Sequence, residues 1–396
     1  MRPEPSPRID DQRSPRIDDQ MIAVAREQLA DFGPLIERAD PRASVSPRSR
    51  MLCAGLAGLA RACLRGLAPE PDAIDPTLAR EVGEAAAMLS LLTKIDDQVI
   101  DALDFHGGPT RRRDPIALDR RTRAYLAPTL ASLRQATPVT REPRCELAAR
   151  LGQRLRALAS SRERLDHLLA TIAFGWEVQV RAVRLLSSDP AEVEASAIAA
   201  VSADISGAWL LMITMIGELP EVAARPIGAH EQQAFYRWGL AIQAADALAD
   251  LGKDTRDGLV ASWPGVLLDR AEPGRCRWRA ALGSPRAEQA ALAQLYAGMG
   301  EHAIDLAILP TPAQLDQLEL ELAGLGEVAR WLRWIHGFLS WRWLEHPLCP
   351  RPSPSAAHRA ILVDESKLLG ASWEQRLGVH QEQEQEQEQE QACSAR

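Results

Sequence analysis

The stretch Gln243-Ala-Ala-Asp-Ala-Leu-Ala-Asp-Leu-Gly-Lys-Asp-Thr-Arg-Asp257 combines an apolar helical pattern with a regular series of carboxylates. Asp246, Asp250 and Asp254 recur every four residues, so on a helix their side chains share one face. Like charges at this spacing destabilise an isolated helix, and no base interrupts the series on that face. The series is either a solvated helix face or a binding site for Mg²⁺, which prefers carboxylate oxygens together with substrate phosphates.

A second acidic cluster, Lys94-Ile-Asp-Asp-Gln-Val-Ile-Asp-Ala-Leu-Asp104, lies about 150 residues earlier in the chain. Asp97 and Asp101 are four residues apart and therefore predicted to share a helix face, whereas Asp96 is rotated by about 100°. Carboxylates near the C-terminal end of a helix also oppose the helix dipole. A bound divalent cation would offset both electrostatic costs.

The two clusters together favour a metal site over two unrelated solvated faces. Two facing helices that each carry carboxylates would form a cage for metal ions holding a diphosphate. Lys94, Lys253 and Arg256 lie in or beside the clusters and are predicted to contact the phosphate oxygens.

The rest of the chain is predicted to form a series of helices, because apolar residues recur at i, i+3, i+4 and i+7. The predicted helices are 21–32, 51–66, 78–103, 118–135, 145–157, 162–186, 190–217, 229–251, 277–302, 312–322 and 325–343. Alternating strand patterns are scarce and no βαβ rhythm is present, so an all-α fold is expected. Motifs typical of serine hydrolases, zinc proteases, dinucleotide-binding proteins and P-loop enzymes are absent from the sequence.

Composition narrows the class of protein further. The 396 residues are 46% hydrophobic and carry a net charge of −8, which disfavours nucleic-acid binding. The most apolar stretch, Ile205–Gly217, is too short to span a bilayer and is predicted to be a buried core helix. No secretory signal pattern is visible and the six cysteines form no CxxC pair, so a cytoplasmic protein with reduced thiols is expected.

Three segments are expected along the chain. Residues 1–20 contain the direct repeat Ser-Pro-Arg-Ile-Asp-Asp-Gln and are predicted to be a disordered lead-in. Residues 21–350 would form one all-α domain. Residues 351–396 are predicted to be an irregular segment followed by a disordered tail rich in Gln and Glu.

The later acidic cluster resembles the second aspartate-rich motif of the squalene/phytoene synthase family, which reads Q-x-x-N-x-x-R-D-x-x-x-D. Gln243, Asp250 and Asp254 are in register with it, Asp246 stands where the family has Asn, and Ala249 where it has Arg. The triple-Asp form is also similar to the bacterial tetraprenyl-β-curcumene synthase family.

Three further segments carry the resemblance. The Asp97-xxx-Asp101 spacing resembles the first DxxxD motif of the family, with Lys94 in place of its preceding Arg. Ile205–Thr214 resembles the A-G-T helix, with Gly207 matching one glycine. Phe174–Gln179 resembles the helix ending in Gly-Met-x-x-Asp, with Gln179 in place of that Asp.

This resemblance implies a class I isoprenoid synthase helical bundle around a central apolar cavity. The implied ligands are two or three Mg²⁺ ions and a prenyl diphosphate. The implied metal-binding residues are Asp97, Asp101, Asp246, Asp250 and Asp254, of which all but Asp246 are also the implied catalytic residues. The implied substrate-binding residues are Lys94, Gln243, Lys253, Arg256, Trp176, Gly207 and Trp209, the two tryptophans through cation–π contact.

The resemblance implies ionisation of the prenyl diphosphate, followed by cyclisation of the carbocation to a terpene. The alternatives are a head-to-head condensation of the squalene/phytoene type and a non-catalytic helical scaffold. The family carries a Tyr-rich stretch just before its A-G-T helix, whereas this chain has Ala200-Val-Ser-Ala-Asp204, and this difference favours cyclisation. A hydrophobic terpene product is compatible with peripheral membrane contact. The sequence does not indicate an oligomeric state.

Overall fold

In a computed structural model, the structure describes residues 27–28, 30–35, 47–102, 114–186, 195–249 and 312–344. These residues form an α-helical bundle without β-strands, so the prediction of an all-α fold is confirmed for the described part. Its long helices are α2 (Pro47–Leu67), α3 (Pro76–Ala102), α4 (Pro115–Gln135), α5 (Pro143–Leu158), α6 (Arg162–Leu186), α7 (Ala195–Glu218), α8 (Ala229–Ala249), α13 (Pro312–Glu321) and α14 (Val328–Leu344). The short 3₁₀ helices η2 (Pro71–Ala73) and η4 (Ala323–Leu325) precede α3 and α14. The lead-in 1–20, the tail 351–396 and the predicted helix 277–302 lie outside the described residues.

Local chemistry explains where several helices begin. Helices α3, α4 and α5 each begin at a proline, whose fixed φ suits the first helical turn and whose missing N–H costs nothing there. The Asp75 carboxylate caps α3 by accepting the Thr77 N–H at 2.8 Å. The Asp114 carboxylate accepts the N–H groups of Ile116 and Ala117 at the start of α4. These side chains satisfy N–H groups that the first helical turn leaves without backbone partners.

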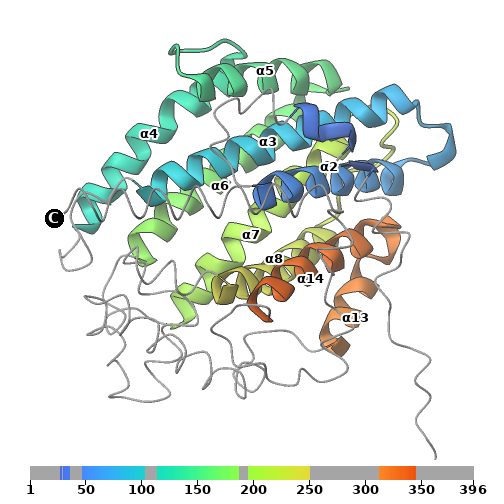
Figure 1. Ribbon diagram of the computed structural model, residues 1–396. Coiled ribbons are helices and arrows are strands. Elements are labelled where there is room, and N and C mark those ends of the chain that lie inside the picture. The colour runs from blue at the N-terminus through green and yellow to red at the C-terminus, as the bar shows by residue number, and fades with distance from the viewer. Residues whose placement is uncertain are drawn as a thin grey trace, which may run out of the picture.

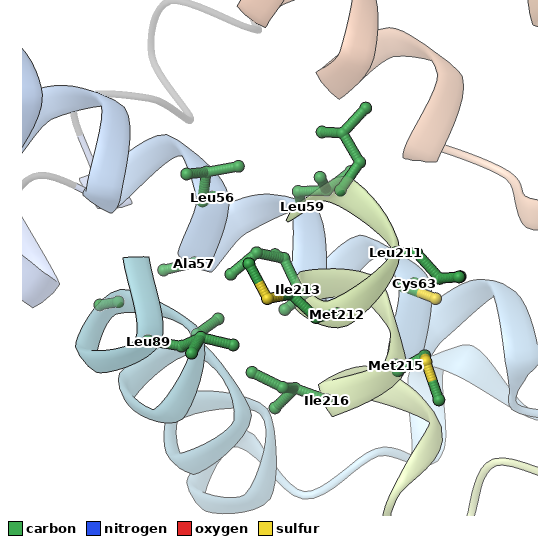
Figure 2. Close-up of a cluster of buried hydrophobic side chains, with 14 of the residues drawn as sticks. Leu56, Ala57, Leu59, Cys63, Leu89, Leu211, Met212, Ile213, Met215 and Ile216 are labelled. Atoms are coloured by element: carbon green, nitrogen blue, oxygen red, sulfur yellow. The ribbon is translucent and has the colours of Figure 1, made fainter. Parts of the chain in front are cut away.

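Helix α7 is the central element of the bundle, because it contacts α2, α3, α6 and α8. In Figure 1 it lies between the layer formed by α3 and α6 and the layer formed by α8 and α14. Figure 2 shows Met212, Ile213 and Ile216 of α7 meeting Leu89 of α3 and residues of α2 in the hydrophobic core. Only helices with small or apolar residues on most faces pack on several sides at once, and α7 has such a sequence.

The length of the apolar segment differs from the sequence expectation. Ala200–Glu218, a part of α7 with mean hydropathy 1.5, is long and apolar enough by composition to cross a membrane. Of this stretch, 72% is buried inside the protein. This burial fits the predicted buried core helix, although the helix extends further than the 13 residues of the apolar run.

Close backbone approach fixes the position of α8 against α7. A Cβ added at Gly239 would overlap the backbone of Gly207, and one added at Gly207 would overlap Tyr236. The Ser206 hydroxyl also donates to Gln243 Oε1 at 2.7 Å across the same contact. Glycine at both positions therefore lets the two helices touch and fixes which α8 residues face the bundle interior.

Candidate active site

A cavity opens between α3, α6, α7 and α8, with one residue each from α2 and α14 in its wall. Its volume is about 180 Å³, larger than the ~150 Å³ of an engineered apolar cavity that accepts benzene. The apolar part of the wall consists of Leu52, Ile100, Gly175, Trp176, Ala182, Val183, Ile205, Trp209, Met212, Ile242, Ala247 and Leu339. The polar part consists of Thr93, Lys94, Asp96, Asp97, Gln179, Ser206, Gln243 and Asp246. The cavity thus combines apolar walls with oxygen atoms that can bind a metal ion and with the ammonium group of Lys94.

Both acidic clusters contribute to this one cavity. Lys94 and Asp97 of α3 and Gln243 and Asp246 of α8 all line it, although about 150 residues separate the two pairs. In the scaffold alternative, the two clusters are only solvated helix faces. Their convergence on one cavity is the arrangement expected of a shared site.

The Asp97 carboxylate is held from two sides. Gln179 Nε2 of α6 donates to Asp97 Oδ1 at 2.9 Å. Lys94 Nζ lies 3.5 Å from Asp97 Oδ2 and 6.0 Å from the centre of the Trp209 ring. The side chains of Lys94 and Asp97 are 26% and 35% exposed, so an incoming ligand can reach both. The amide orients the carboxylate, and the ammonium lies over the aromatic face in the position that a ligand cation would favour.

Asp96, the neighbour of Asp97, is a cavity residue that the sequence reasoning did not select. Its side chain is 1% exposed, and Arg144 of α5 lies 3.7 Å from Oδ1. Burial raises the pKa of Asp96 to about 7, against the opposing effects of the Arg144 guanidinium and the Tyr125 hydroxyl. The Arg144 guanidinium stacks on the Tyr125 ring at 3.5 Å. The packing of α5 against α3 places Arg144 beside this acid, and no sequence signal indicates that packing.

The predicted site residues have different positions in the structure. Trp176 and Trp209 line the cavity, as do Lys94, Asp97, Gln243 and Asp246. Gly207 does not belong to the wall, because it lies at the contact of α7 with α8. Asp101 lies on α3, and nothing is described of its side chain. Asp250, Lys253, Asp254 and Arg256 lie outside the described residues.

The donor chemistry fits a hard divalent cation. Asp97 and Asp246 supply carboxylates from two different helices, and Mg²⁺ prefers oxygen ligands. Within the described residues, no group of three or more His, Cys, Asp or Glu side chains is close enough to hold a metal ion. A complete metal site therefore needs further ligands, from water, from substrate phosphate or from the predicted acids beyond those residues.

No protein-family model matches this chain, and no curated protein matches it in sequence. Among solved structures it is similar to a polyprenyl synthase from Caulobacter crescentus CB15, solved in complex with calcium and isoprenyl diphosphate. The sequence identity is 16%, the match covers 84% of this chain and 99% of that chain, and the TM-score is 0.49. So distant a likeness carries no argument about the site, which rests on its own residues.

Proposed function

We propose that this protein is a Mg²⁺-dependent class I isoprenoid synthase that ionises a prenyl diphosphate and cyclises the carbocation to a terpene. One observation carries the proposal: Lys94 and Asp97 meet Gln243 and Asp246 at a single cavity that also has an apolar wall. A prenyl diphosphate has the same two-part character, with an anionic head and a hydrocarbon tail. The two aspartate-rich sequence motifs and the cavity therefore point to one substrate class.

The proposed metal ligands are Asp97 and Asp246, joined by Asp101, Asp250 and Asp254 of the same sequence motifs. Bound Mg²⁺ would neutralise charge on the diphosphate leaving group. Gln179 would keep the Asp97 carboxylate in place through its 2.9 Å hydrogen bond. Lys94, with Lys253 and Arg256, would pair with phosphate oxygens as negative charge develops on them.

The hydrocarbon part would lie against the cavity wall after ionisation. Trp176 and Trp209 line that wall. Aromatic faces stabilise cations through the ring quadrupole, and the effect grows as water is excluded. Trp209 would thus stabilise the carbocation while the apolar wall keeps water away from it.

Cyclisation is proposed over head-to-head condensation because the chain lacks the Tyr-rich stretch of the condensing family. In its place the chain has Ala200-Val-Ser-Ala-Asp204, which lies within α7. A cytoplasmic location is also proposed, because no secretory signal pattern is visible in the sequence and its six cysteines form no CxxC pair.

The test is incubation of the purified protein with geranyl, farnesyl and geranylgeranyl diphosphates, with Mg²⁺ or with EDTA, followed by gas chromatography–mass spectrometry. A cyclic hydrocarbon or alcohol formed only with Mg²⁺ is the expected result. A doubled linear chain would replace cyclisation by condensation. Failure to consume any of the three diphosphates would contradict the proposal.

A further inference from the structure

Gly175 is an unusual wall residue of the cavity, because nothing in helix packing requires its small size. It lies in the interior of α6, where glycine costs roughly 0.5–1 kcal/mol relative to alanine. The atoms nearest to a Cβ added there would be Met212 Sδ at 3.7 Å and Met212 Cε and Ala208 Cβ at 3.9 Å. These are ordinary van der Waals distances, so a Cβ would fit there without displacing a neighbour, and a longer side chain would narrow the cavity that Gly175 lines.

Other helical glycines of the bundle behave differently. A Cβ at Gly83, Gly152, Gly207, Gly217 or Gly239 would come closer than 3.0 Å to a neighbouring helix or side chain. Those glycines allow helices to approach one another. Gly175 instead lines the cavity, and the atom nearest to an added Cβ belongs to the flexible side chain of Met212, which lines it too.

Gly175 and Met212 lie away from the polar end of the cavity. Along α6, Gly175 precedes Gln179 by four residues, which corresponds to about 6 Å of helix. Along α7, Met212 follows Ser206 by six residues, or about 9 Å. Met212 also belongs to the closed hydrophobic core shown in Figure 2, next to Ile213. The two residues therefore form the end of the cavity that borders the core, opposite the acids.

We propose that Gly175 and Met212 determine the length of the hydrocarbon chain that the cavity accepts. Gly175 supplies the space, and the Met212 thioether is the movable end wall of that space. Methionine suits this role because it is unbranched, has three rotatable bonds and adapts to irregular volumes. The inference rests on the proposed function for the diphosphate head, but the hydrocarbon part of the argument depends only on the cavity.

The experiment measures binding of ligands of increasing length to the full chain in the presence of Mg²⁺. The ligands are geranyl, farnesyl and geranylgeranyl diphosphates and the three corresponding alcohols, which lack the anionic head. The variants are Gly175→Leu, which fills the space, and Met212→Ala, which deepens it. Ala170→Leu, an exposed change on the same helix, is the matched control. Tryptophan fluorescence reports binding, and circular dichroism confirms that each variant folds.

Gly175→Leu is expected to weaken binding of the longest chain relative to the shortest by about tenfold or more, because excluded methylene groups lose their burial. Met212→Ala is expected to shift the preference towards longer chains, and Ala170→Leu to leave it unchanged. Equal length preferences in all four proteins would overturn the inference, as would failure of the unmodified protein to bind any alcohol or diphosphate. Binding of alcohols with the predicted shifts but without any preference for diphosphates would overturn the proposed function and support this inference.

Discussion

Two parts of the bundle interior are built around tryptophans, and they differ in how neighbouring glycines are used. Between α2 and α14, Trp331 and Trp334 lie edge to face with ring centres 5.7 Å apart. Gly58 and Gly55 of α2 lie directly under these rings, so an added Cβ would overlap them. In the cavity wall, Gly175 lies beside Trp176, and an added Cβ would meet Met212 and Ala208 at ordinary van der Waals distances.

The difference shows that tryptophan and glycine together are not enough to identify a functional pocket. We call the contact of Gly55 and Gly58 with Trp334 and Trp331 the seam between α2 and α14. The absence of a Cβ at these glycines lets the aromatic rings occupy the space, and packing is complete. At the cavity, no neighbour comes close enough to require glycine at position 175, and this residue borders open volume. Unfilled apolar volume next to carboxylates is what distinguishes a candidate active site from a well-packed core.

The largest expected effect is the difference in stability between a variant that loses a tryptophan between α2 and α14 and one that loses a cavity tryptophan. Trp331→Ala should lower the free energy of unfolding by about 3–5 kcal/mol, because it removes a ring that is 2% exposed and fully packed. Trp209→Ala, which alters a partly buried ring at the cavity, should cost clearly less stability while impairing product formation. Urea denaturation of both variants, with a product assay, tests the contrast. Equal losses of stability would remove the distinction between seam and cavity.

The cavity wall also holds the buried acid Asp96, whose pKa is raised to about 7 from 3.8 by burial. The folded protein therefore binds a proton that the unfolded chain has already lost between pH 4 and 7. Stability from this group is present at low pH and is lost as the pH rises through about 7. The loss should reach roughly 2–4 kcal/mol.

Asp96→Asn should abolish that part of the pH dependence. Chemical denaturation in EDTA from pH 4 to 8 should show the free energy of unfolding of the unmodified protein falling relative to the variant. Parallel curves would mean that Asp96 titrates normally in the folded protein.

Gly58→Ala probes the seam directly. The added methyl group overlaps the Trp331 ring, and overpacking of this kind costs about 1–3 kcal/mol. Thermal melting should therefore show a lower midpoint than for the unmodified protein. A variant that melts at the same temperature would show that α14 moves away from α2 without cost.

Gly175→Ala is the matched change at the cavity, and it should raise the free energy of unfolding rather than lower it. The new Cβ meets Met212 and Ala208 at ordinary distances, and alanine is the better helix former. A gain of roughly 0.5–1 kcal/mol is expected in the same melting experiment. Destabilisation would indicate that the space beside Gly175 is occupied in solution.

The sequence predicted the number and order of the described long helices because their apolar periodicity is local information. Several helix starts were placed two to four residues late, since the periodicity begins after the proline. Pro47, Pro76, Pro115 and Pro143 stand at the observed starts, and proline at the first helical position could have located them.

The candidate site was predictable only in part. Spacing identified Asp97 and Asp246, because carboxylates four residues apart share a helix face. The burial of Asp96 depends on Arg144 of a later helix, and the role of Gly207 depends on Tyr236 and Gly239. Such long-range packing leaves no periodic pattern around either residue.

The most direct test of the account is Mg²⁺-dependent release of inorganic diphosphate from farnesyl and geranylgeranyl diphosphates. Asp97→Asn and Asp246→Asn should each reduce the rate by at least about a hundredfold, since even side chains that only orient metal ligands contribute 10–100-fold. Glu81→Gln, an exposed change on the same helix as Asp97, should release diphosphate at the unmodified rate. Equal rates in all four proteins, or release that persists in EDTA, would contradict a shared metal and diphosphate site at this cavity.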